Sequence, residues 1–269
     1  MERYKTILSI AGSDSSAGAG IQADIKTIAA LQCYACTVIT AVTAQNTQGV
    51  QSIHTIPADE IKKQLQSIVD DIEIDAVKIG MLGNIESIKV VVEFLKQHQL
   101  PNIVLDPVMV ATSGDSLFDT TALEILKNEL IPISNLVTPN VSEAAVLLDG
   151  ETISNDTMRD STVRLGLKYN VPILLKGGHM VGKDSKDYLF IDLDSEIHQL
   201  AAPTIDSQNT HGTGCTLSSA IASFLAKGMN LEQAVLKAKG YITQSIGAGK
   251  YLTLGKGHGP VHHFWEFWD

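Results

Sequence analysis

The protein is a chain of 269 residues, of which 44% are hydrophobic and 19% are charged. This composition excludes a disordered or fibrous chain and fits a soluble enzyme with a substantial core. The formal net charge of −10, without a cluster of lysine or arginine, argues against general nucleic-acid binding. No hydrophobic run approaches the length of a membrane span, and the first hydrophobic stretch is too short for a secretion signal. We therefore expect a cytoplasmic protein that binds neither membrane nor nucleic acid.

Short hydrophobic segments alternate with amphipathic ones along almost the whole chain. The strands predicted from them, in chain order, span residues 6–10, 36–42, 76–80, 103–105, 136–137, 173–175 and 188–191. The clearest amphipathic helices span residues 58–71, 85–95, 216–226 and 231–242. This alternation predicts βαβ units, and so an α/β fold with a mainly parallel sheet and helices on both faces. Without a repeat, linker or change of composition, residues 1–269 are expected to form a single domain.

Three cysteines, Cys33, Cys36 and Cys215, are an odd number for a disulfide scaffold and fit a reducing compartment. Cys33 and Cys36 have the C-x-x-C spacing of a redox pair, which normally opens a helix after a strand. Here the pair lies between the end of a predicted helix and the start of a strand. We therefore expect two buried structural thiols.

Glycine-rich and polar motifs follow the predicted strands directly. In order, they are AGSD with the GAG triplet (residues 11–20), TAQN (43–46), GM (80–81), DPVM (106–109), TPN (138–140) and KGGH (176–179). In open parallel sheets, ligands bind beyond the carboxyl ends of the strands. The repeated placement predicts that one edge of the sheet carries a binding site.

The motif THGTGC at residues 210–215 precedes the helix predicted at 216–226. Its two glycines let successive backbone N–H groups point into one space, and a helix start adds a partial positive charge. This arrangement suits a phosphate and would lower the pKa of the Cys215 thiol. Read alone, the motif also fits a glycine-rich turn followed by a buried cysteine.

The common nucleotide motifs do not explain these loops. The segment GAGIQA at 18–23 matches the dinucleotide pattern, but the turn before it is too long and the expected acidic residue is missing. The sequence also lacks a Walker A motif and the G-x-S-x-G motif of serine hydrolases. A phosphate site would therefore depend on backbone N–H groups, a metal ion or a few lysines.

Two pairs of residues fit both a structural and a functional interpretation. Asn140 and Glu143 are spaced to hold the water shell of Mg²⁺, and the same spacing suits a helix capping box. Lys176 and Gly178 follow a predicted strand, where a glycine admits a phosphate and a lysine balances its charge. A simple turn with an exposed lysine has the same pattern.

Taken together, the motifs are typical of one kinase family. Besides those above, the chain contains KIGMLG at 78–83 and GHGPV at 257–261. In these motifs it resembles the ribokinase-like small-molecule kinases, specifically the hydroxymethylpyrimidine/phosphomethylpyrimidine kinases of thiamin biosynthesis. The resemblance covers nearly the whole chain and implies a three-layer αβα sandwich, usually a homodimer. It also implies ATP- and Mg²⁺-dependent phosphorylation of 4-amino-5-hydroxymethyl-2-methylpyrimidine and then of its monophosphate.

The same resemblance assigns roles to individual residues. The expected catalytic residues are the base Cys215 and the anion hole of Gly212, Thr213 and Gly214. The expected substrate-binding residues are Gln45, Gly12, Asp24, Met81 and Val108. The Gln45 amide would pair with the amino group and a ring nitrogen of the pyrimidine. The ATP phosphates are expected at Asn140, Lys176, Gly178 and Thr213, and the metal at Asp106 and Glu143.

Other activities remain open at this stage. Related kinases phosphorylate pyridoxine or pyridoxal, and some carry a second cysteine in the lid after the Asp-Pro-Val motif, where this chain has VATS at 110–113. Thr112 also stands where many family members have lysine, which removes the usual basis for a lid contact with phosphate. A binding module that has lost turnover is a further alternative, and the retained Cys215, Asn140 and Glu143 argue against it.

Overall fold

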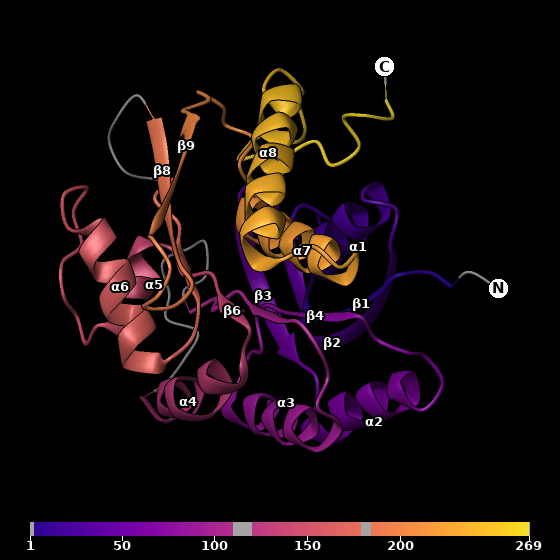
Figure 1. Cartoon of the computed structure of the whole chain (residues 1–269). Coiled ribbons are helices and arrows are strands. Elements are labelled where there is room, and N and C mark those ends of the chain that lie inside the picture. Colours follow the sequence, from indigo (N-terminus) through magenta and orange to yellow (C-terminus); the bar gives the residue numbers. More distant parts are fainter. Residues whose placement is uncertain (1–2, 110–119, 179–183, 269) are drawn as a thin grey trace.

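The computed structural model describes residues 3–109, 120–178 and 184–268. Within these residues, nine strands form one sheet in the order β3-β2-β1-β4-β5-β6-β7-β8-β9 (Figure 1). The strands are β1 (Thr6–Asp14), β2 (Tyr34–Asn46), β3 (Gly49–Thr55), β4 (Ala76–Ile79), β5 (Ile103–Leu105), β6 (Leu136–Val137), β7 (Ile173–Leu175), β8 (Asp184–Phe190) and β9 (His198–Pro203). Neighbours from β2 to β7 pair in parallel, whereas β3 at one edge and β8 and β9 at the other are antiparallel.

Helices cover both faces of this sheet, as Figure 1 shows. One layer consists of α1 (Gly20–Ala30), α7 (Thr213–Ala226) and α8 (Leu231–Gly249). The other consists of α2 (Ala58–Val69), α3 (Ile85–His98), α4 (Thr120–Ile125), α5 (Val141–Leu147) and α6 (Met158–Tyr169). A π-helical turn (Leu126–Leu130) and a 3₁₀ turn (Ile131–Ile133) continue α4. The predicted three-layer αβα sandwich is thus confirmed.

The central strands are hydrophobic on both faces because each face is covered. In β1, Ile7 packs into the layer of α1, α7 and α8, whereas Leu8 and Ile10 pack into the opposite layer. Successive side chains of a strand point to opposite faces of the sheet. All three side chains are fully buried, as is typical of parallel strands between two helical layers.

The edges of the sheet differ most from the prediction. The strands β3 and β9 were not predicted, and β3 lacks a hydrophobic pattern because Gln51, Ser52 and His54 are exposed along it. In addition, β1 and β2 extend past their predicted ends, so that Asp14 pairs with Thr43. The AGSD and TAQN motifs therefore lie in strand ends rather than in loops. Backbone pairing does not require hydrophobic side chains, which is why hydrophobicity alone ended these strands too early.

The cysteine pair at the start of β2 is structural, as expected, with Cys33 just before the strand and Cys36 within it. Cys33 and Cys36 are both free and buried. Burial raises the pKa of both thiols. The Cys33 Sγ lies 3.6 Å from the Leu31 carbonyl oxygen, to which it donates a hydrogen bond.

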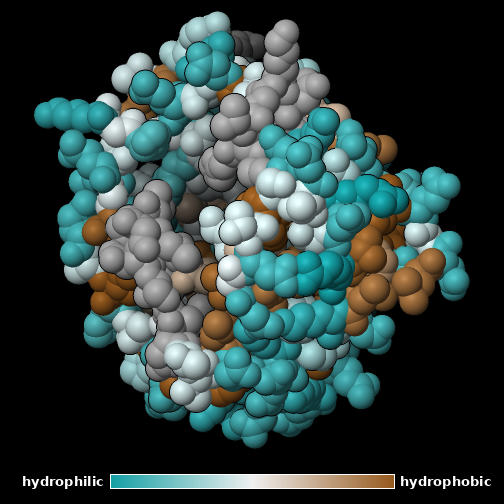
Figure 2. Space-filling view, turned by 90° about the vertical axis from the view of Figure 1, so that its left-hand side faces the viewer, coloured by the Kyte–Doolittle hydropathy of each residue, from teal (hydrophilic) through white to brown (hydrophobic). Residues whose placement is uncertain are grey.

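The surface toward α6 has little continuous hydrophobic area. The face drawn in Figure 2, which is the left-hand side of Figure 1, is mainly hydrophilic with hydrophobic residues in separate groups. Among the residues that the structure describes, no helix combines the length and hydrophobicity needed to cross a bilayer.

Candidate functional site

Two cavities lie at the carboxyl ends of the parallel strands. The first cavity is formed mainly by β1, β2, β3 and the segment after β4, and the second by the segments after β6 and β7 together with α7 and α8. Cys215 lines the first cavity, whereas Thr213 and Gly214 line the second. The start of α7 therefore lies between the two cavities.

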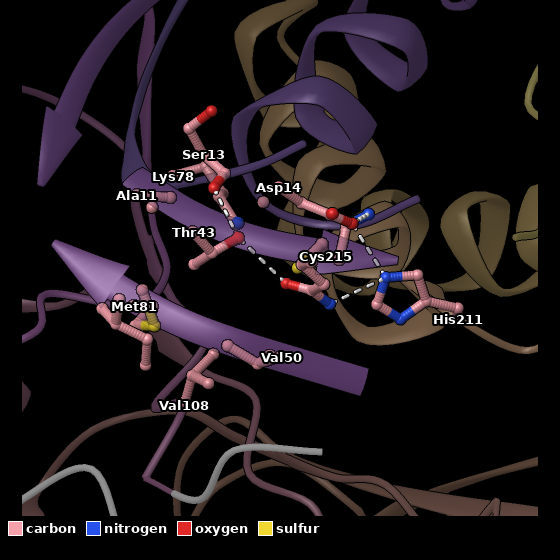
Figure 3. Close-up of a pocket in the computed structure, with 15 residues that line it drawn as sticks. Ala11, Ser13, Asp14, Thr43, Val50, Lys78, Met81, Val108, His211 and Cys215 are labelled. Atoms are coloured by element: carbon pink, nitrogen blue, oxygen red, sulfur yellow. Dashed lines mark hydrogen bonds and ion pairs between the residues drawn. The ribbon is translucent and has the colours of Figure 1, made fainter. Parts of the chain in front are cut away.

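The first cavity brings together four of the five predicted substrate-binding residues, Gly12, Gln45, Met81 and Val108, and also Cys215. Figure 3 shows a hydrophobic side with Met81, Val50 and Val108, and a polar side with Asp14, Cys215 and His211. A Cβ on Gly12 would lie 2.4 Å from the Met81 Cε, so the end of the Met81 side chain packs directly against the backbone of β1. The cavity thus offers a flat hydrophobic surface beside a few polar groups, which suits a planar ring.

A chain of polar side chains lines the other side of the first cavity. The Nε2 of His211 lies 2.8 Å from the Asp14 Oδ2 and 3.2 Å from the Gln45 amide. Burial raises the pKa of Asp14, but hydrogen bonds from His211, Ser16 and Ala19 outweigh it and hold that pKa well below its usual range. Sequence reasoning assigned no role to Asp14 or His211, although both lie in its motifs. A titratable pair inside two glycine-rich motifs is the signal that could have identified them.

The predicted substrate residue Asp24 lies beneath this cavity instead of in it. Its carboxylate is fully buried and pairs at 2.9 Å with the fully buried ammonium of Lys78. It also accepts hydrogen bonds of 2.6 and 2.7 Å from the hydroxyls of Ser9 and Ser219. Lys78 itself lines the cavity. Asp24 therefore does not line this cavity and adjoins it through its ion pair with Lys78, and its role in substrate binding stays a prediction.

The environment of Cys215 also differs from the expectation. Burial raises the pKa of its thiol to about 11, although the nearby Lys78 and a hydrogen bond from the Gly20 N–H both lower it. The carboxylates of Asp24 and Asp106 raise it further. The predicted lowering of this pKa by the start of α7 is therefore wrong, because removal of water from the sulfur dominates.

Two glycines, Gly18 and Gly212, allow the backbone before α1 to pack closely against the backbone before Cys215. Gly212 has a φ of 80°, and a Cβ on it would lie 1.9 Å from the carbonyl oxygen of Gly18. A Cβ on Gly18 would in turn lie 2.3 Å from the His211 Cδ2. The segment before α1 and the segment before α7 can therefore approach each other only with glycine at both positions.

The second cavity brings together the predicted phosphate-binding residues Asn140, Lys176, Gly178 and Thr213. The Lys176 Nζ lies 2.7 Å from the Asp106 Oδ1. A Cβ on Gly214 would lie 3.4 Å from this Nζ, so the start of α7 packs directly against the ion pair. A helix start beside a lysine is a favourable site for a phosphate group.

Asn140 and Glu143 form the capping box of α5. The Asn140 Oδ1 accepts a hydrogen bond of 2.9 Å from the Glu143 N–H, and the Glu143 Oε2 accepts one of 2.8 Å from the Asn140 N–H. Burial raises the pKa of the Glu143 carboxyl to about 7, while Lys176 opposes this rise. The capping interpretation is therefore correct.

The structure also allows the metal-binding interpretation. Asp106 and Glu143 influence each other electrostatically, and both lie close to Lys176. Among the described residues, no cluster of three or more histidine, cysteine, aspartate or glutamate side chains could enclose a metal ion. Magnesium prefers oxygen ligands, keeps several waters and needs few protein ligands. Two carboxylates beside a phosphate site fit such an ion.

A second buried ion pair in this cavity was missed. The Lys239 Nζ on α8 lies 2.5 Å from the Asp187 Oδ2 on β8, and the Asp187 Oδ1 accepts a hydrogen bond of 2.9 Å from the Gly177 N–H. Both side chains line the second cavity. Neither residue lies in a motif, so no sequence signal could have found them.

Thr112 and His179 lie outside the described residues.

Comparison with known proteins supports one family. A model of the family described as phosphomethylpyrimidine kinase matches residues 14–262. A hydroxymethylpyrimidine/phosphomethylpyrimidine kinase of Rhizobium meliloti is 46% identical over 266 residues, which are 97% of this chain and 97% of that protein. The thiamine biosynthesis bifunctional protein ThiED of Geobacter sulfurreducens is 45% identical over 96% of this chain, which spans only 52% of that longer protein.

Solved structures agree with this assignment. A phosphomethylpyrimidine kinase of Clostridium difficile is 41% identical, with a TM-score of 0.77 over 90% of this chain and 99% of that one. A pyridoxal kinase of Bacillus subtilis, solved as an ADP complex, is 33% identical, with a TM-score of 0.89 over 97% and 98% of the two chains. Since the family model covers most of the sequence and the full-length relative shares nearly half of its residues, this chain belongs to the phosphomethylpyrimidine kinase family.

Proposed function

We propose that the protein transfers the γ-phosphoryl group of ATP to the hydroxymethyl group of 4-amino-5-hydroxymethyl-2-methylpyrimidine, and then to the resulting monophosphate. The observation that carries this proposal is the pairing of the two cavities across the start of α7. One cavity offers a planar hydrophobic site with an amide, and the other offers phosphate-binding groups. Membership of the family supports the same reaction.

The first cavity is proposed as the acceptor site. Its hydrophobic residues Met81, Val50 and Val108 lie on one side and suit one face of an aminopyrimidine ring. The Gln45 amide has a donor and an acceptor side by side, which match a ring nitrogen and its neighbouring amino group. This complementarity favours an uncharged ring that is read by hydrogen bonds.

The second cavity is proposed as the nucleotide site. Its polar part contains Lys176, Asn140 and the start of α7, which would hold the phosphates. Its apolar part contains Ile205, Ile242 and other hydrophobic side chains, which suit the nucleotide base. In this arrangement the terminal phosphate would point toward Cys215 and the acceptor.

Asp106 and Glu143 are proposed to hold Mg²⁺ through its water shell. Bound there, Mg²⁺ would neutralise charge on the phosphate oxygens. Lys176 pairs with Asp106 in the structure. Its ammonium would move from this carboxylate toward a phosphate when a nucleotide binds, since it pairs with either anion. The N–H groups of Gly214 and Cys215, in the first turn of α7, add fixed positive dipoles.

Cys215 is proposed as the base that accepts the proton of the hydroxymethyl group at its Sγ. Because the pKa of the thiol is about 11, only a small fraction is thiolate at neutral pH. Phosphoryl transfer depends mainly on positioning and charge stabilisation, so a sparsely populated thiolate is compatible with slow turnover. Lys78 and the Gly20 N–H would stabilise the thiolate when it forms.

Pyridoxal or pyridoxine is the second candidate acceptor, since the fold matches a pyridoxal kinase with a TM-score of 0.89. The discriminating experiment is a steady-state comparison of the aminopyrimidine alcohol with pyridoxal and pyridoxine, using Mg-ATP and the purified chain. We expect the highest kcat/KM with the aminopyrimidine and formation of its diphosphate. A preference for pyridoxal would reverse the assignment. If none of the three acceptors supports ATP turnover, both candidate functions are contradicted.

We also propose that the protein acts in the cytoplasm, as a homodimer with a single kinase domain per chain. Three free cysteines support a reducing compartment. The dimer is an expectation from the family. Light scattering of the purified chain would test it, because a monomeric mass at micromolar concentration contradicts the proposal.

A further inference from the structure

Hydrogen counting decides which nitrogen of His211 carries a proton. The Asp14 Oδ2 accepts hydrogen bonds from the N–H groups of Gly18 and Ala19 at 3.0 and 2.8 Å. Its Oδ1 accepts two from Ser16, one from the N–H and one from the hydroxyl. A carboxylate in this position acts only as an acceptor. The His211 Nε2, 2.8 Å from Oδ2, must therefore carry a hydrogen and donate it.

This proton constrains the neighbouring amide of Gln45. The structure places the Gln45 amide nitrogen 3.2 Å from the same His211 Nε2. Two N–H donors would then face each other, because Nε2 has no free lone pair when it donates to Asp14. Amide oxygen and nitrogen positions are assigned from their hydrogen-bond partners. Because the partner on this side is the N–H of His211, the amide oxygen of Gln45 belongs here.

The other end of the amide is compatible with the same orientation. The Thr43 hydroxyl has a single hydrogen, and its Oγ1 lies 3.0 Å from the Ser13 carbonyl oxygen and 3.2 Å from the Gln45 amide. When the hydrogen is donated to Ser13, the Thr43 oxygen can only accept from Gln45. An amide nitrogen beside Thr43 therefore suits this end. At the other end, the single hydrogen of His211 Nε2 is shared between Asp14 and the Gln45 oxygen, which replaces a contact between two donors.

We propose that Asp14 and His211 are positioning residues that hold the Gln45 amide with its oxygen toward His211 and its nitrogen toward Thr43. The inference rests on the proposed aminopyrimidine acceptor. The amide N–H then faces the ring nitrogen, and the amide oxygen faces the amino group. The hydroxymethyl group, attached beyond the amino group, lies on the His211 side. Cys215 and His211 both lie on the polar side of the first cavity (Figure 3), so this orientation directs the alcohol toward the base.

The proposal predicts how the protein treats an acceptor with reversed hydrogen bonding. In 5-hydroxymethyl-2-methylpyrimidin-4(3H)-one the ring N–H is a donor and the oxygen is an acceptor, so it needs the opposite amide orientation. The wild-type protein should discriminate strongly against it. In His211→Phe, which removes the fixed donor, the amide can turn. The ratio of the kcat/KM values for the amino and oxo compounds should fall by about tenfold or more.

A purely structural role for His211 would lower both kcat/KM values equally and leave this ratio unchanged, which would overturn the proposal. The wild-type protein also allows a direct measurement that does not depend on the variant folding. Long-range ¹H–¹⁵N correlation should show His211 with a protonated Nε2, and an unprotonated Nε2 would overturn the amide assignment. This spectrum is independent of turnover, so failure of the proposed kinase activity would be distinguishable from failure of the inference.

Discussion

The two cavities hold their polar groups in different ways. In the first cavity, Gln45, His211 and Asp14 form a connected set of hydrogen bonds, and Lys78 is locked to a fully buried Asp24. In the second cavity, Lys176 and Lys239 line the open space and pair with buried carboxylates, and both lysine side chains are 14% exposed. The first cavity is therefore preorganised by internal contacts, whereas the second holds cations that can exchange partners.

This difference matches the two kinds of ligand. A neutral ring gains little binding free energy from charged groups and is recognised by directional hydrogen bonds. Its hydrogen-bonding partners therefore need fixed orientations. A nucleotide brings several negative charges, and cations that already have carboxylate partners avoid mutual repulsion before it binds. The predictions below test whether rigidity and exchange are indeed divided between the cavities in this way.

The largest effect is expected from Cys215→Ala, which removes the proposed base between the two cavities. The kcat should fall by about 10²- to 10⁴-fold, with little change in ATP affinity. Turnover and nucleotide titration measure the two quantities separately. Cys36→Ala is the matched control, because Cys36 is a buried thiol that lines neither cavity. A fully active Cys215→Ala protein would contradict the assignment.

Replacement of Lys78 tests the rigidity of the first cavity. Lys78→Met leaves the Asp24 carboxylate fully buried without its ion-pair partner, so the free energy of unfolding should fall by about 3–5 kcal/mol. Denaturant unfolding measures this loss. The double variant with Asp24→Asn removes both charges and should recover part of the stability. If the single and double variants are equally unstable, the buried charge is not the cause.

The corresponding change in the second cavity should affect binding more than stability. Lys176→Met removes a cation proposed to contact phosphate, so the KM for ATP should rise about ten- to hundredfold. The Lys176 side chain is 14% exposed and lines the second cavity, whereas Lys78 and Asp24 are both fully buried, so the loss of stability should be smaller than for Lys78→Met. An unchanged KM for ATP, or a loss of stability equal to that of Lys78→Met, would remove the distinction between the two cavities.

The smallest effect, when taken per pH unit, is expected on the pH dependence of turnover. The pKa of Cys215 is raised to about 11, so the thiolate fraction increases with pH throughout the neutral range. If the thiolate is the base, kcat should rise about tenfold per pH unit between about pH 7 and pH 9. A rate profile measured at saturating ATP and acceptor checks this slope. A plateau that begins near neutrality would show that Cys215 is not titrating as proposed.

Much of the architecture could be predicted from the sequence. The order of strands and helices, the layers and the edge that carries the site follow from local hydrophobic patterns and from the position of motifs after strands. The capping box at Asn140 could be predicted for the same reason, because its two residues lie three positions apart. By contrast, the edge strand β3 could not, since its pairing with β2 involves backbone groups.

The sequence by itself determined which residue types lie at the carboxyl end of the sheet, because side-chain alternation and helix periodicity are local properties. Only the tertiary structure decided what each of them does there. Asp24 is removed from the cavity by Ser9, Lys78 and Ser219, which come from three separate elements. The pKa of Cys215 is likewise raised by desolvation and by the carboxylates of Asp24 and Asp106, which are distant in the sequence. The burial and the pKa of a side chain depend on all of its neighbours in space, and the spacing of residues along the chain does not reveal those neighbours.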